Sequence, residues 1–123
     1  METVDKWIDI FEADLKIKCD REVVYNLYKT GQSLELIDTG FALCYCFTDI
    51  LGHKICSEIM LYLKPECRNI ENFKQLVEFV EATAVKNGCD FVQMGSFTGY
   101  QDEKVLKMYQ RLGYKTASVR KEL

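Results

Sequence analysis

The sequence has 123 residues, of which 48% are hydrophobic and 28% charged, and its formal charge is −3. This composition is typical of one compact globular domain spanning residues 1–123. The longest apolar run, Phe41–Phe47, is far shorter than the roughly 20 residues that cross a bilayer, and the N-terminus carries acids where a signal peptide needs a basic flank. We therefore expect a soluble, cytoplasmic protein without a membrane partner.

Basic residues do not gather into a stripe that could follow a phosphate backbone. The 16 Lys and Arg residues are scattered among 19 Asp and Glu residues, and the basic stretch 115–123 is typical of a solvated strand face. Nucleic acid is therefore not an expected partner.

The cysteine pattern favours reduced thiols, because no secretory signal or dense disulfide framework accompanies the six cysteines. A zinc site is the alternative, since a hairpin near Gly52 would bring together Cys44, Cys46, His53 and Cys56. Zinc ligands normally come in Cys-x-x-Cys turns, whereas Cys44 and Cys46 are separated by one residue within an apolar run. The spacing thus favours ordinary strand cysteines and no metal.

Two helices are expected in the first thirty residues. The first carries apolar side chains at helical spacing, namely Val4, Ile8, Phe11 and Leu15. The second follows Cys19, with Asp20 as its N-terminal cap and Gly31 at its end.

The rest of the chain predicts an α/β (α+β) fold. Strands are expected over 33–38, 41–50 and 54–63 as an antiparallel meander, followed by a helix that Asn69 caps and Asn87–Gly88 ends. A buried strand over 89–97, a helix over 101–112 and a final strand over 114–123 complete the pattern. A strand, helix, strand succession implies a parallel crossover, so we expect one mixed sheet with helices on both faces.

Two motifs carry a family resemblance. "YLKPECR" ends a predicted strand before a long helix, and "MYQRLGY" lies near the C-terminus. With the order of elements, residues 33–123 resemble the GNAT superfamily of acetyl-CoA-dependent N-acetyltransferases. The resemblance implies acetyl-CoA as the acyl donor and an amine, either a small molecule or a protein, as the acceptor.

In that family the donor's pyrophosphate lies on backbone N–H groups of a loop that reads Arg or Gln, two variable residues, Gly, one variable residue, and Gly or Ala. The resemblance places residues of this chain there, namely Arg68, Asn69, Ile70, Asn72 and Phe73. It also implies that strand backbone near Leu61 and Leu63 holds the donor in a splay between 58–63 and 91–96.

The loop departs from the family pattern at both glycines, because Glu71 and Phe73 stand in their places. A carboxylate in a first helical turn suits the dipole of an empty helix and would repel a pyrophosphate. The alternative interpretation is structural, with Asn69 as a helix cap, Phe73 in the core and Arg68 as a surface cation.

The resemblance also suggests catalytic residues. Tyr109 in "MYQRLGY" falls on the family's usual general acid, which protonates the leaving thiolate; a phenol, with an ordinary pKa of about 10, suits that role. A base must also deprotonate the ammonium of the acceptor, and Glu58 is the acid in the strand before the loop. The alternatives are that Tyr109 fills the core and that Glu58 points to water.

Two further departures concern the ends of the sheet. The family usually opens with a strand and closes with a strand hairpin, whereas here helical sequence begins at once and ten residues follow Gly113. Compact chains with altered loops occur among bacteriophage-encoded members, which would work in the host cytoplasm. The second hypothesis is thus a structural or host-interacting protein that has lost acetyl-CoA binding and forms a homodimer or adds a partner strand at an open edge.

Overall fold

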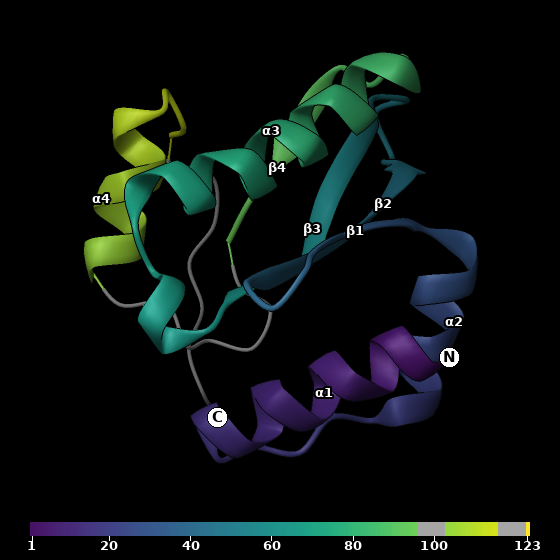
Figure 1. The fold of residues 1–123 in the computed structure, drawn as a ribbon. Coiled ribbons are helices and arrows are strands. Elements are labelled where there is room, and N and C mark those ends of the chain that lie inside the picture. Colours follow the sequence, from purple (N-terminus) through teal and green to yellow (C-terminus); the bar gives the residue numbers. More distant parts are fainter. Residues whose placement is uncertain (96–102, 116–122) are drawn as a thin grey trace.

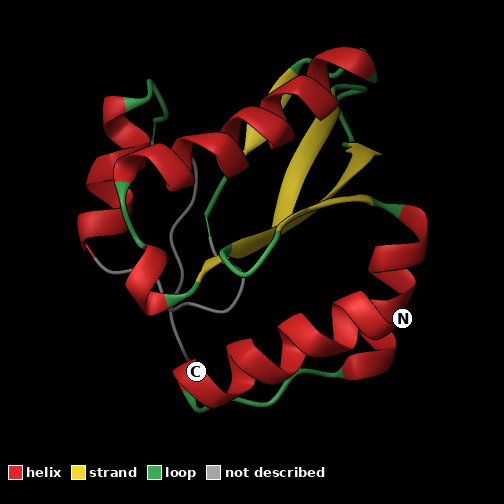
Figure 2. Ribbon diagram, in the orientation of Figure 1, coloured by secondary structure: helices red, strands yellow, loops and turns green. Residues whose placement is uncertain are grey.

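The computed structural model describes residues 1–95, 103–115 and 123 (Figures 1 and 2). Its elements, in chain order, are α1 (Glu2–Leu15), α2 (Arg21–Thr30), β1 (Gln32–Leu36), β2 (Gly40–Thr48), β3 (Lys54–Leu63), the 3₁₀ turn η1 (Pro65–Cys67), α3 (Ile70–Lys86), β4 (Phe91–Gln93) and α4 (Glu103–Arg111). The predicted order is confirmed up to α4. Most of the predicted final strand, 114–123, lies outside the described residues.

The strands form one mixed sheet in the order β1-β2-β3-β4. The first three pair antiparallel, and β3 pairs with β4 in parallel across the crossover through α3. The predicted fold class is therefore confirmed. The prediction of a buried strand over 89–97 is wrong in part, because β4 spans three residues and Phe91 is 53% exposed, packing edge-on against the ring of His53.

Helices cover both faces of the sheet, with α1 and α2 on one side and α3 on the other (Figure 1). On the α1 side, Trp7 is fully buried and stacks on Phe41 of β2, in a cluster that includes Met60 and Tyr62 of β3. The α3 side holds two clusters that join α3 and α4 to the sheet, with buried members Ala42, Leu63, Phe73, Leu76, Val77 and Tyr109 in one and Cys44, Cys56, Val80 and Ala84 in the other.

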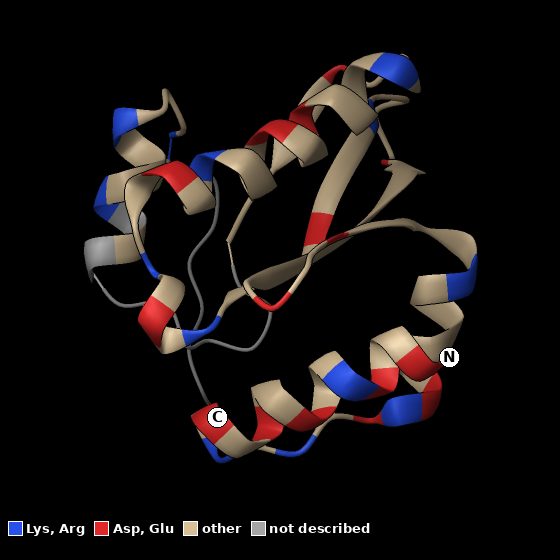
Figure 3. Cartoon of the chain, in the orientation of Figure 1, with Lys and Arg blue, Asp and Glu red and all other residues tan. Residues whose placement is uncertain are grey.

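An ion-pair cluster fastens α2 to α1. The guanidinium of Arg21 contacts the carboxylates of Asp9 at 2.5 Å, Glu12 at 2.9 Å and Asp5 at 3.3 Å. Glu12 also accepts a hydrogen bond from the backbone N–H of Cys19, and these contacts lower the pKa of Glu12. Acids predominate on α1 and cations lie on α2 and at the helix ends (Figure 3), so Arg21 neutralises part of the acidic face of α1.

The predicted helix ends are confirmed. Asp20 accepts a hydrogen bond from the backbone N–H of Val23, and Asn69 accepts one from Asn72. Gly31 ends α2 where the chain passes close to β2, and a Cβ atom there would lie 2.4 Å from the carbonyl oxygen of Cys44. Only glycine therefore fits this passage without moving backbone.

Within the described residues, no helix has both the length and the apolar character needed to cross a bilayer.

We predict that Gly31→Ala destabilises the fold by about 1–3 kcal/mol, because the new methyl group must displace the backbone of β2 or α2. Urea unfolding followed by circular dichroism measures the change. Gln32→Ala is the matched control, since Gln32 is exposed and adjacent in sequence. Equal stabilities of the two variants would contradict the steric explanation.

Candidate functional site

An irregularity in the β2–β3 ladder shapes the centre of the sheet. Leu43 pairs with Met60 and Cys44 pairs with Glu58, so Ile59 is an extra residue in β3. Ile59 and Met60 consequently both pack on the α1 side, although successive strand residues normally alternate. The β-bulge therefore lies between Glu58 and the last four residues of β3, Met60 to Leu63, which pair regularly with β2.

The pairing of β3 with β4 ends at the same place. The parallel ladder covers three residue pairs, the last of which joins Ser57 to Gln93, whereas β3 continues to Leu63. Among the described residues, the stretch of β3 from Glu58 to Leu63 has no strand partner on that edge. Leu61 and Leu63 lie on this stretch, as the predicted splay requires, and their side chains pack in the cluster under α3.

Glu58 is buried at the point where the two ladders change. It is 2% exposed and pairs across the sheet with Cys44, whose side chain packs against α3, so Glu58 faces the same layer. Within the described part of the chain, its Oε2 is the buried side-chain polar atom without a hydrogen-bond partner. Burial raises the pKa of Glu58 to about 8, which makes the carboxyl a proton carrier near neutral pH.

Tyr109 lies on α4 and faces the layer between α3 and the sheet. It is 4% exposed, and its ring packs edge-on against Phe73 at 5.1 Å and Tyr114 at 5.6 Å between centroids. The cluster around it includes Leu63 of β3. Tyr109 is therefore a core residue, as the structural interpretation predicted, on the same side of the sheet as Glu58.

Arg68 is an exposed cation, as the structural interpretation predicted, and its guanidinium contacts neighbouring residues of the protein. Its Nε donates to the carbonyl oxygen of Leu63 at 3.0 Å, and one terminal nitrogen donates to Asp14 Oδ2 at 2.7 Å. The same carboxylate oxygen accepts the hydroxyl of Tyr62 at 2.8 Å, and the guanidinium lies over the Tyr62 ring. The network ties the end of β3 to α1.

The start of α3 is a capped helix terminus. Asn69 Oδ1 accepts the Asn72 N–H at 2.8 Å, and the side-chain amide of Asn72 donates to the Cys67 carbonyl at 2.9 Å. Ile70 is 46% exposed, and Phe73 is buried against Tyr109. The sequence-predicted loop residues are thus brought together, with Asn69 and Phe73 in the structural roles that the alternative interpretation gave them.

The structure gathers four cysteines on the α3 side without forming a metal site. Cys46 and Cys89 have sulfur atoms 3.5 Å apart, and the buried Cys44 and Cys56 lie in the same cluster. Burial raises the pKa of Cys56 to about 12, so its thiol stays protonated. In the ranges that the structure describes, no group of three or more His, Cys, Asp or Glu residues could hold a metal.

An apolar groove of about 680 Å³ lies on the opposite face of the sheet. It runs between the α1–α2 junction and strands β2 and β3, and its floor includes Leu43, Ile59 and Met60. Lys18 and Asp20 are the charged residues that line it. Ile59 and Met60 directly follow Glu58 in β3. The groove therefore lies against the α1 face of this strand, whereas Glu58 lies on its α3 face.

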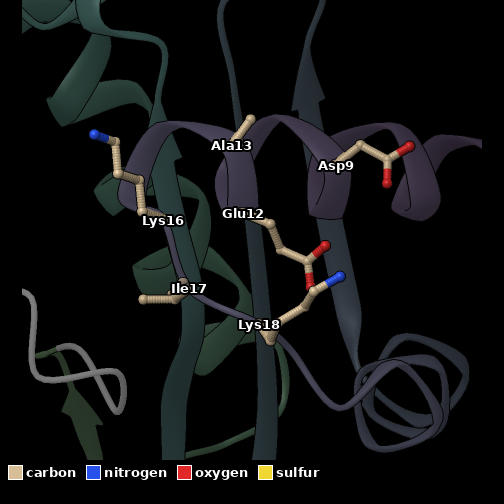
Figure 4. Close-up of a pocket in the computed structure, with 6 residues that line it drawn as sticks. All are labelled: Asp9, Glu12, Ala13, Lys16, Ile17 and Lys18. Atoms are coloured by element: carbon tan, nitrogen blue, oxygen red, sulfur yellow. The ribbon is translucent and has the colours of Figure 1, made fainter.

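A second hollow, of about 460 Å³, lies at the end of α1 (Figure 4). Its lining includes Asp9 and Glu12, whose carboxylates already pair with Arg21, and Lys16 and Lys18 at the helix end. This hollow sits among contacts that hold α1 to α2, and two of the carboxylates that line it are already paired with Arg21, whereas the lining of the larger groove is mostly apolar. The larger groove is therefore the better candidate for a ligand.

Sequence reasoning missed the β-bulge, the Asp14–Arg68 contact and the groove. Each depends on which residues pair across strands or between distant elements. Only the unusual run of large apolar residues from Ile59 to Leu63 carried a signal, since a regular half-exposed strand would alternate.

Comparison with known proteins gives a likeness in structure alone. The sequence matches no protein-family model, and no curated protein matches it. A putative acetyl transferase from Pyrococcus furiosus has a similar structure, with a TM-score of 0.74 and 15% identity over 99% of this chain and 93% of that one.

Two further acetyltransferases show the same likeness. An aminoglycoside acetyltransferase from an uncultured soil metagenomic sample, solved in complex with trehalose, has a TM-score of 0.76 at 15% identity, covering 99% of this chain and 88% of its own. A ribosomal-protein-alanine N-acetyltransferase from Brucella melitensis biovar Abortus 2308 has a TM-score of 0.71 at 12% identity, covering 97% and 89%. The chain therefore has the GNAT acetyltransferase fold.

We predict that ionisation of Glu58 destabilises the folded protein as pH rises. The pKa of Glu58 is about 8 when folded and near the ordinary 4.5 when unfolded, so between these values the folded state binds the extra proton. Stability then falls by at most about 1.4 kcal/mol per pH unit in this window. Urea unfolding of the wild type and Glu58→Gln at pH 5, 6, 7 and 8 measures the slope, which the variant should lose.

The control is Glu78→Gln, because Glu78 is an exposed acid on α3. It should keep the wild-type slope. If Glu58→Gln kept that slope as well, the carboxyl of Glu58 would not be the group that titrates.

Proposed function

We propose that this protein is an N-acyltransferase that moves an acetyl group from a thioester, acetyl-CoA in the resembled family, to an amine. The observation that carries the proposal is Glu58, a buried carboxyl at the end of the β3–β4 ladder whose Oε2 has no hydrogen-bond partner among the described residues. Burial of a carboxyl oxygen without a hydrogen bond is costly, and buried acids with perturbed pKa values concentrate at functional sites. Acetyltransferases with the same fold support the assignment.

Glu58 would act as the general base. An amine acceptor arrives as an ammonium, and the carboxylate of Glu58 takes one proton so that the nitrogen lone pair can attack the thioester carbonyl carbon. Its raised pKa supports this role, because a base that titrates near the working pH combines sufficient basicity with partial ionisation.

Tyr109 would act as the general acid. As the carbon–sulfur bond breaks, its hydroxyl proton passes to the departing thiolate, and the phenolate regains a proton that the nitrogen loses as the amide forms. Tyr109 is buried between α3 and the sheet, in the same cluster as Leu63. Glu58 faces this layer too, and the shared location supports the assignment.

The acceptor would lie in the apolar groove on the α1 side. The groove floor contains Ile59 and Met60, which follow Glu58 in β3. Because Glu58 faces the α3 side, an amine in this groove would have to pass the outer edge of β3, beyond Ser57, to meet the carboxyl.

We predict that acetylation of a model amine rises with pH. kcat/KM should increase about tenfold per pH unit below the Glu58 pKa of about 8 and level off above it. Glu58→Gln should lower kcat/KM by roughly 10²-fold or more and abolish this inflection. A Gln variant with an unchanged pH profile would remove Glu58 from the mechanism.

Tyr109→Phe tests the acid, because it removes one oxygen and keeps the ring in the core. We expect turnover to fall by roughly 10²-fold with little change in donor affinity. Tyr109→Ala should instead destabilise the fold by about 3–5 kcal/mol, since it opens a cavity beside Phe73. Calorimetric titration with acetyl-CoA accompanies both, and full turnover in the Phe variant would restrict Tyr109 to packing.

A further inference from the structure

Two cysteines from different elements meet at one end of the sheet. Cys46 lies near the end of β2, and Cys89 lies in the turn between α3 and β4. The thiol of Cys89 donates to the sulfur of Cys46, and the two sulfur atoms are 3.5 Å apart. A disulfide bond needs about 2.05 Å between its sulfurs, so a movement of roughly 1.5 Å would join the two side chains.

Backbone hydrogen bonds hold the turn that carries Cys89 against β3. The N–H of Cys89 donates to the carbonyl of Ala84 at 2.9 Å, and the N–H of Asp90 donates to the carbonyl of Lys54 at 2.7 Å. The carboxylate of Asp90 in turn accepts the N–H of Lys54 at 2.9 Å. Since β2 pairs with β3 as far as Cys46 and beyond, both sulfurs are held by the same strand. Their proximity is therefore a property of the folded state.

The pair is accessible to solvent, unlike the cysteines beside it. Cys46 and Cys89 are half-buried, whereas Cys44 and Cys56 are fully buried. The thiol of Cys56 donates to the Val80 carbonyl, and burial raises its pKa to about 12, so it does not supply a thiolate. A reagent in solution can therefore reach Cys46 and Cys89 in preference to their neighbours.

We propose that Cys46 and Cys89 are a redox modification site, at which a low-molecular-weight disulfide such as oxidised glutathione converts the two thiols into a reversible disulfide bond. The site does not depend on the acyl transfer proposed above. Burial raises the pKa of both thiols, so the thiolate that starts the exchange is scarce at neutral pH and the first step is slow. The second step is fast by comparison, because the two sulfurs already lie together.

The exchange takes two steps, and Cys46 is the first nucleophile because its sulfur accepts the thiol hydrogen of Cys89. The Cys46 thiolate attacks one sulfur of oxidised glutathione, and one glutathione leaves as a thiolate. The Cys89 thiolate then attacks the Cys46 sulfur of this mixed disulfide and releases the second glutathione. The two leaving thiolates take up the two protons that the protein thiols lose, so the protein gives up two electrons and oxidised glutathione gains them.

Oxidation of the folded, reduced protein with oxidised glutathione tests the site. Peptide mapping by mass spectrometry, with fragmentation that assigns each cysteine, should find Cys46 linked to Cys89 at least about tenfold more often than any other pair. Dithiothreitol should restore both thiols. A link between Cys46 and Cys56, or a glutathione adduct on Cys46 that never resolves, would overturn the proposal.

Oxidation in concentrated urea shows whether the fold selects this pair. The preference for the link between Cys46 and Cys89 should fall by about tenfold when the chain is unfolded, because the sulfurs are then no longer held together. Equal preference in the folded and the unfolded chain would contradict the structural explanation.

Serine variants test the two positions separately. Cys46→Ser and Cys89→Ser should each abolish the loss of two thiols, whereas Cys67→Ser, which replaces another half-buried cysteine, should leave it unchanged. Circular dichroism shows which variants fold, and Cys89→Ala takes the place of Cys89→Ser should the latter not fold. Loss of two thiols in either the Cys46 or the Cys89 variant would assign the reaction to another pair and overturn the proposal.

Discussion

The antiparallel ladder between β2 and β3 is the contact on which the other layers depend. Before the bulge at Ile59, the α3 side of β3 carries Cys56 and Glu58; after it, the same side carries Leu61 and Leu63. A regular strand would turn the later residues to the other face, because a shift of one residue exchanges the faces. The bulge therefore lets α1 and α3 both pack on β3, and it sets Glu58 at the boundary.

That boundary is where the fold tolerates an unfavourable group. Glu58 is buried and its Oε2 has no hydrogen-bond partner in the described part of the chain, so ionisation is disfavoured and the carboxyl holds its proton near neutral pH. Stability comes from the clusters on either side, where Trp7 stacks on Phe41 and Phe73 packs against Tyr109. Natural sequences break local rules mainly at functional sites, which is the physical reason to assign chemistry to this carboxyl.

The sequence predicted the elements of the fold well and the geometry of the site poorly, for separate reasons. Helix boundaries follow local signals, so the caps Asp20 and Asn69 were identified correctly. The burial of Glu58 and the anchoring of Arg68 by Asp14 depend on partners 14 or more residues away, which no local pattern specifies. The prediction of a long buried strand was wrong for a similar reason. The apolar composition of the segment does not reveal that its pairing with β3 ends at Gln93.

The two features that the family resemblance assigns to a donor site, a strand edge and a helix N-terminus, respond differently to sequence change. Recognition by a strand edge uses N–H and C=O groups that nearly every residue supplies, so substitutions along β3 leave it in place. Recognition at a helix N-terminus requires small residues and no opposing charge, which Glu71 violates. A chain can thus keep the fold of acetyltransferases at a TM-score of 0.74 while its sequence matches no family model. In the proposed function, divergence of the loop would therefore affect how a donor is held, whereas the buried carboxyl on β3 would affect whether a proton can be moved.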